Sequence, residues 1–143
     1  MNDILLELLS LYGIKEIAGP EHNQIIVNMF AEIGYPHVKD DDSTAWCSAA
    51  LNYICKKLGY ERSGELTARS WLKMPIIVLK PTLGDIAIFW REDKNGWKGH
   101  VGLYISETKD GVYVLGGNQN NSVNITLYPK ANLLGYRQTK KII

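Results

Sequence analysis

Two cysteines and three histidines are the residues of this chain best suited to nucleophilic catalysis. Cys47 follows the polar run 40–44, in which Ser43 or Thr44 is suited to cap a helix beginning near Ala45. We therefore expect Cys47 in the first turn, where free N–H groups and the helix dipole favour a thiolate, the species that attacks a carbonyl. The alternative is that Cys47 is a small buried hydrophobic residue.

Cys55 lies eight residues further along the same predicted helix, near its C-terminal end. There the helix dipole disfavours a thiolate. Eight residues at 1.5 Å each separate the two cysteines by about 12 Å, which is too far for a disulfide. We therefore expect Cys55 to be a packing residue.

A cysteine nucleophile needs a base, and His100 is the best placed of the three histidines. His22 lies at the start of a predicted helix and His37 in a polar loop, where surface or capping roles are expected. His100 instead opens a predicted strand over 101–105. At a strand start, a fixed side chain can face the beginning of a helix.

An orienting group for His100 is expected from the following strand. That strand, over 112–115, leads into a run of glycine and asparagine that contains Asn118 and Gln119. In an antiparallel hairpin, its end lies beside the beginning of the His100 strand. An amide oxygen of Asn118 is then suited to accept the ring N–H and to set the tautomer. A plain turn is the alternative for this run.

The elements that position these residues change in type halfway along the chain. Apolar residues recur at helical spacing near the N-terminus and over 21–34 and 45–58, and 66–72 fits a short helix. Five strands are then predicted over 86–90, 101–105, 112–115, 123–127 and 133–137, with a short extended piece over 76–79. This order predicts an α+β fold with N-terminal helices packed on an antiparallel sheet of about five strands.

Length and composition limit the classes of protein that the chain fits. The 143 residues suit one domain spanning 1–143. The net charge of +1 argues against binding nucleic acid through phosphate neutralisation or binding a membrane through a polybasic surface. Two cysteines are too few for a disulfide scaffold, and the acidic run 40–42 lacks the calcium-loop spacing, so no metal site is expected.

The N-terminus lacks the pattern of a signal peptide, and no apolar run approaches the roughly 20 residues of a membrane span. We therefore expect a chain that does not insert into a membrane and is made in the cytoplasm without a signal peptide.

Five segments together resemble the NlpC/P60 and CHAP cysteine peptidases, and more narrowly their small phage and bacterial peptidoglycan hydrolases. They are residues 42–47, 68–72, 84–91, 96–102 and 115–119, within a resemblance that covers roughly 13–137. The resemblance implies a papain-like fold in which a helix carries the nucleophile against an antiparallel sheet that carries the histidine. It also implies cleavage of amide bonds in peptidoglycan stem peptides without a metal or an organic cofactor.

The resemblance assigns the nucleophile to Cys47 and the general base to His100. Asn118 matches the third, orienting position, with Gln119 as the alternative. Many CHAP domains have an acidic residue two places before this asparagine, where the present chain has Gly116.

Four further residues are expected to contact substrate. Asp42 and Ser48 match positions of the family, while Trp46 beside the nucleophile and Trp97 before His100 are placed to line a cleft. The other two tryptophans, Trp71 and Trp90, are expected to be packing residues.

The expected activity is that of a peptidoglycan endopeptidase, with cleavage of the sugar–peptide amide as the other possibility. It would act at the cell wall or periplasm after release or delivery by another system. Two alternatives stay open: an antibacterial effector of the same fold, neutralised by an immunity protein, and a non-catalytic wall-binding or phage structural module.

Overall fold

The computed structural model describes residues 2–17, 21–39 and 45–142. Its helices are α1 (Asp3–Leu9), α2 (Gln24–Glu32), α3 (Cys47–Leu58) and two short 3-10 helices, η1 (Ala68–Lys73) and η2 (Lys130–Asn132). Its strands are β1 (Ile76–Val78), β2 (Ile86–Trp90), β3 (Gly99–Glu107), β4 (Gly111–Gln119), β5 (Ser122–Pro129) and β6 (Leu133–Gln138).

The strands form one sheet in the order β1-β6-β2-β3-β4-β5, and every neighbouring pair is antiparallel. The predicted α+β class is therefore confirmed at this level, with helices first and strands afterwards. The sheet has six strands rather than about five, because the short extended piece pairs with β6 as β1. The predicted bounds of β2 are those observed, whereas β3 and β4 are longer than predicted.

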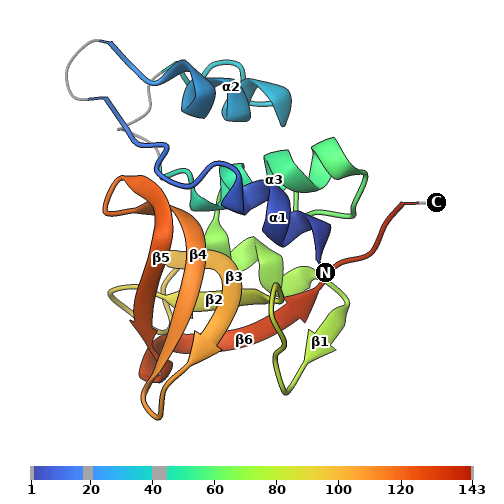
Figure 1. Cartoon of the computed structure of the whole chain (residues 1–143), viewed down its shortest axis with the longest axis vertical. Helices are drawn as coiled ribbons and strands as arrows, with labels where there is room; N and C mark the ends of the chain where they lie inside the picture. Colours follow the sequence, from blue (N-terminus) through green and yellow to red (C-terminus); the bar gives the residue numbers. More distant parts are fainter. Residues whose placement is uncertain (1, 18–20, 40–44, 143) are drawn as a thin grey trace.

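Helix α3 is the central helix of the molecule (Figure 1). It contacts α1 and α2 and packs against β3 and β4 of the curved sheet. Gly59, in the left-handed conformation with φ of 80°, ends the helix. The other end of α3 carries Cys47, which contacts the backbone N–H of Val101 in β3.

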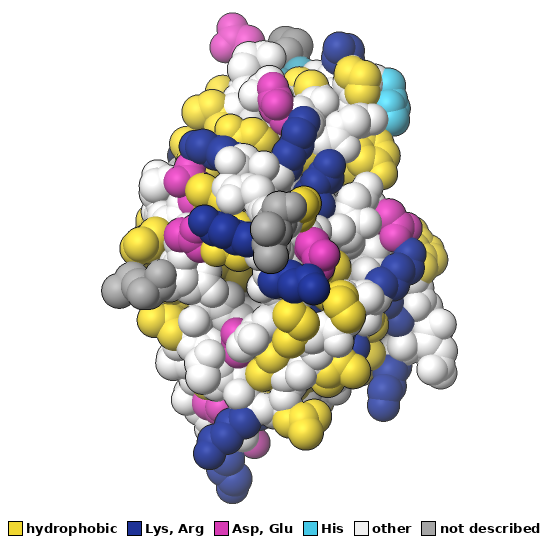
Figure 2. All heavy atoms as spheres, turned by 90° about the vertical axis from the view of Figure 1, so that its right-hand side faces the viewer, with side chains coloured by type: hydrophobic (Ala, Val, Ile, Leu, Met, Phe, Trp, Pro, Cys, Tyr) yellow, Lys and Arg dark blue, Asp and Glu magenta, His cyan; other side chains and the backbone are white. Residues whose placement is uncertain are grey.

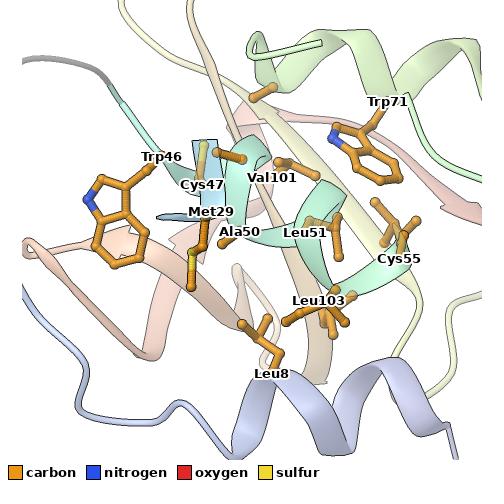
Figure 3. Packing of buried hydrophobic residues seen from close by; sticks show 14 of the residues in the cluster. Leu8, Met29, Trp46, Cys47, Ala50, Leu51, Cys55, Trp71, Val101 and Leu103 are labelled. Atoms are coloured by element: carbon orange, nitrogen blue, oxygen red, sulfur yellow. The ribbon is translucent and has the colours of Figure 1, made fainter. Parts of the chain in front are cut away.

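The two faces of the sheet belong to two hydrophobic clusters. The larger cluster joins the helices to the sheet and includes Cys47, Val101 and Leu103, some of whose members are drawn in Figure 3. The second lies on the opposite face of the sheet and includes Phe89 and Tyr128. Because side chains alternate along a strand, Val101 faces the helices while its neighbour His100 faces the second cluster.

Charges are mixed over the surface drawn in Figure 2. Lysine and arginine side chains are interspersed there with acidic and hydrophobic ones. None of the helices that the structure describes has the length and apolar character needed to cross a membrane.

Candidate active site

Cys47 is the first residue of α3, as the sequence predicted for a first-turn position. The expected cap is wrong in detail: Trp46, not Ser43 or Thr44, is the N-cap residue, and its side chain makes no capping hydrogen bond. The first intrahelical bond of α3 runs from Ala50 N–H to the Trp46 carbonyl. The N–H groups at positions 47–49 thus have no acceptor within the helix.

The thiol of Cys47 is not poised as a thiolate in this structure. Its side chain is buried, and burial raises the pKa of the Cys47 thiol, although backbone N–H groups of Val101 and Ser48 and the charge of Arg91 oppose the rise. The expectation of a lowered pKa is therefore wrong, because desolvation outweighs the helix terminus. The contact with the Val101 N–H brings Cys47 to the start of β3, next to His100.

His100 is also buried, within an aromatic environment. Its ring stacks on Tyr128 of β5 with centroids 4.6 Å apart and planes 14° apart. Burial lowers the pKa of His100 to about 4, against a hydrogen bond that the ring donates to Gln119 and that raises it, while the charge of Arg91 lowers it further. His100 is thus neutral near pH 7, and its uncharged ring is available as a base.

Gln119 fixes the ring of His100 through a hydrogen bond of 2.8 Å between its Oε1 and the His100 Nε2. The Gln119 amide nitrogen donates to the Val114 carbonyl and to both oxygens of Asn124, so its Oε1 is the atom left to face the ring. His100 Nε2 must therefore carry the hydrogen, and Nδ1 carries the lone pair. A neutral ring held in this tautomer can take a proton at Nδ1.

The structure corrects the expected partner of His100 from Asn118 to its alternative, Gln119. Asn118 adopts a left-handed conformation with φ of 56°, and the β4–β5 register shifts between Gly116 and Gln119. This irregularity changes the alternation of side chains, so that Gln119 faces His100. A Cβ on Gly116 would lie 2.6 Å from Gln119 Oε1, so glycine at the position that is acidic in many CHAP domains makes room for this contact.

A cavity of about 250 Å³ opens beside Cys47. Its lining includes Cys47, Ala45, Leu66, Ala68, Arg91 and Trp97. Trp97 is 68% exposed and lies in the loop before His100, which agrees with the expectation that it lines a cleft. Of the two candidate reactive side chains, only Cys47 lines this cavity.

The expected substrate contacts of Trp46 and Ser48 are wrong for this structure, because both residues are fully buried. Trp46 packs against Gly117 and donates from Nε1 to Glu16. Ser48 donates to the Glu65 carbonyl and accepts from Trp71, so both side chains hold the fold together. Asp42 lies outside the described residues.

The packing roles of three other residues agree with the structure. Cys55 is fully buried, is not disulfide-bonded, and has its pKa raised by burial from 9.0 to about 12. Trp71 is fully buried and Trp90 is partly buried.

The site includes two residues that sequence reasoning missed. Arg91 acts electrostatically on both Cys47 and His100, and Tyr128 stacks on His100 while its own pKa is raised by burial and by Cys47. Arg91 follows β2 directly and was within a segment that resembles the family, whereas Tyr128 gave no sequence signal.

Cys47 and His100 make no hydrogen bond to each other within the described part of the chain.

Among the described residues, no group of three or more His, Cys, Asp or Glu side chains is arranged to hold a metal ion. In comparisons with known proteins, no family model and no curated protein matches the chain.

Proposed function

We propose that the protein is a cysteine peptidase of papain-like arrangement that cleaves amide bonds in the peptide part of peptidoglycan. The observation that carries the proposal is the Gln119–His100 hydrogen bond of 2.8 Å, which sets the tautomer of a ring whose chain neighbour Val101 contacts Cys47 through its backbone N–H. A base held in one tautomer is what an uncharged thiol requires. The choice of substrate rests on the resemblance of the five sequence segments.

The reaction requires the Cys47 thiol, which makes no hydrogen bond to His100 in the resting structure, to approach Nδ1 of the ring and transfer its proton there. The sulfur then attacks the substrate carbonyl carbon, and a carbon–sulfur bond forms as the carbonyl π electrons move to oxygen. Backbone N–H groups at the start of α3, that of Cys47 among them, are suited to stabilise this oxyanion, and one such donor contributes roughly 2.7–4 kcal/mol.

Collapse of the intermediate breaks the carbon–nitrogen bond, and the imidazolium gives its proton to the leaving amine. Water then attacks the thioester carbonyl as His100 accepts its proton; the carbon–sulfur bond breaks, the carboxylic acid leaves, and the imidazolium returns the proton to the sulfur. Gln119 keeps the ring in place throughout. The raised pKa of Cys47 and the lowered pKa of His100 mean that the resting pair is neutral.

Digestion of purified peptidoglycan tests this function. The protein should release fragments with new amino and carboxyl termini, detected by mass spectrometry, and Cys47→Ala should lower the rate by at least about a thousandfold. Cys55→Ala is the matched control, since it removes the other thiol of the same helix, and it should digest like the unaltered protein.

The termini also separate the possible activities. A new peptide amine and carboxylate identify an endopeptidase, whereas a complete stem peptide freed from its sugar identifies an amidase. Equal release by the unaltered protein and Cys47→Ala would exclude the peptidase and favour a non-catalytic wall-binding or structural module.

A further inference from the structure

Strand β5 is an outer strand of the sheet, and most of its outer edge pairs with nothing in the described part of the chain. The sheet order places β4 on one side of β5 and no described strand on the other (Figure 1). Only the beginning of the edge is covered: the N–H of Val123 donates to the Ile14 carbonyl at 2.8 Å, and its carbonyl accepts from the Gly13 N–H at 2.8 Å. This edge therefore already accepts one added segment, and an unpaired edge can pair with another chain.

Backbone groups alternate in direction along β5, so the unpaired positions follow from the paired ones. Lys130, just beyond the strand, donates its N–H to the Asp110 carbonyl on the β4 side at 2.8 Å. Val123, Ile125 and Leu127 alternate with that side and point outward, because the pairing with β4 is regular in between. Among the described residues, neither Ile125 nor Leu127 has an outward backbone partner. Each thus offers a free N–H and a free carbonyl.

The side chains at these two positions are apolar and exposed on one face of the sheet. Ile125 lies opposite Leu115, which belongs to the larger hydrophobic cluster, so Ile125 and Leu127 are on the face that the helices partly cover. Ile125 is 40% exposed, Leu127 is 48% exposed, and Tyr113, the β4 partner of Leu127, is 37% exposed. These three side chains form an apolar strip beside the unpaired edge.

Strand β5 lacks the charges that keep an edge strand from pairing. No residue of Ser122–Pro129 is charged, and proline occurs only at its last position. The other edge of the sheet is better protected, because β1 has only three residues and lies between Pro75 and Pro81. Pairing with another chain is therefore expected at β5 and not at β1.

A second copy of β5 is the partner that this edge fits. In an antiparallel pair, facing residues exchange N–H and carbonyl groups, so an edge with both kinds of group complements itself across a twofold axis. Because Ile14 occupies the position beside Val123, the axis must lie further along the strand. With the axis at Leu127, the two copies of this residue exchange both hydrogen bonds. Ile125 then donates to the carbonyl of Pro129 in the other copy, and Pro129 has no N–H that would lack a partner.

We propose that the protein forms a twofold dimer in solution through antiparallel pairing of β5 with the β5 of a second copy. The pairing supplies main-chain hydrogen bonds on both sides of the axis and brings the apolar strips of the two copies together. No like charges oppose each other along the paired strands, since β5 has none. The two six-stranded sheets become one continuous sheet. This inference does not depend on the proposed peptidase function.

Analytical ultracentrifugation and amide hydrogen exchange of the intact protein test the dimer. A small interface of this kind predicts a dissociation constant on the order of 10 µM, so the protein should be largely dimeric at about 200 µM and monomeric at about 1 µM. The N–H groups of Ile125 and Leu127 should exchange at least about fivefold more slowly at the higher concentration, because they are bonded only in the dimer. The N–H of Val123 is the internal control, since it is bonded in both states.

Leu127→Glu and Leu79→Glu are matched variants, because each places a carboxylate on an exposed leucine near one edge of the sheet. Leu79 follows β1 and is 91% exposed, so Leu79→Glu should leave the dimer intact. Leu127→Glu should weaken the dimer at least about tenfold, since two carboxylates then face each other at the axis. Circular dichroism should show both variants folded, because neither side chain is buried.

The outcomes separate this proposal from the peptidase. A protein that stays monomeric at the higher concentration would overturn the dimer. So would a dimer that survives Leu127→Glu, a dimer that Leu79→Glu weakens equally, or exchange at Ile125 and Leu127 that is independent of concentration. A dimer that Leu127→Glu disrupts, in a protein that does not digest peptidoglycan, would support the β5 interface and reject the peptidase.

Discussion

The two cysteines of α3 share a helix, a side-chain chemistry and near-complete burial, yet their surroundings differ. Burial raises the thiol pKa at both positions, but at Cys47 it is opposed by backbone N–H groups and by Arg91, and a cavity reaches the residue. At Cys55, burial raises the pKa from 9.0 to about 12; the charge of Arg62 opposes this rise and that of Asp3 adds to it. The candidate chemistry therefore depends on the end of the helix that meets β3, not on the residue type.

The strongest test of this contrast is the rate of alkylation of each thiol by iodoacetamide. Cys47 should react at least about a thousandfold faster than Cys55, because Cys55 becomes accessible only when the structure opens extensively. Peptide mapping of the native protein over time measures both rates in one sample. The rate at Cys47 should increase with pH, since its raised pKa leaves little thiolate near pH 7.

The Cys47→Ser variant is the control for alkylation, because only the slow reaction should remain. Similar rates at the two thiols of the unaltered protein would remove the distinction between the two ends of α3.

The burial of His100 predicts a second effect: the free energy of unfolding should fall when the pH is lowered. The pKa of His100 is lowered from 6.5 to about 4, so the unfolded chain takes up a proton before the folded chain does. Above pH 6.5, His100 contributes no pH dependence, and between pH 6.5 and 4 it should lower the free energy of unfolding by about 3 kcal/mol.

Urea denaturation at pH 7.5 and pH 4 measures this loss. The His100→Gln variant should lose about 3 kcal/mol less stability than the unaltered protein over the same interval. An equal loss in both proteins would show that His100 is not desolvated in the folded state.

The partner of His100 can be tested by a charge placed at either of two adjacent residues. Gln119→Glu should raise the pKa of His100 by at least about one unit, because a carboxylate in contact with the ring stabilises the imidazolium. The matched control is Asn118→Asp, which adds the same charge one residue away and should shift the pKa less. NMR titration of the ring measures both, and a larger shift in Asn118→Asp would restore the original choice of partner.

The sequence predicted the order of helices and strands well, since hydrophobic spacing and glycine-containing turns are local signals. It also selected Cys47 and His100 as candidate reactive residues, a choice that stays a prediction. It did not choose correctly between Asn118 and Gln119, because one register shift in β4 decides which side chain faces His100. The sequence also predicted a lowered pKa for the Cys47 thiol, whereas the structure raises it, because desolvation depends on residues that are distant in sequence.

The same limit explains the tryptophans and the aromatic neighbour of His100. Trp46 and Trp97 both lie close in sequence to a candidate reactive residue, yet one is fully buried and the other 68% exposed. Tyr128 reaches His100 only because β5 pairs with β4 and the sheet curves. Neither fact follows from local spacing.

The smallest expected effect concerns packing at the Cys55 end of α3. Cys55→Ala removes one buried sulfur and should lower the free energy of unfolding by about 1 kcal/mol, with the rate of peptidoglycan digestion unchanged. Cys47→Ala should cost a similar amount of stability or less, because it borders a cavity, while its digestion rate falls steeply. Urea denaturation and digestion of both variants separate stability from activity. A Cys55→Ala protein that folds normally but digests peptidoglycan slowly would show that Cys55 contributes to activity as well as to packing.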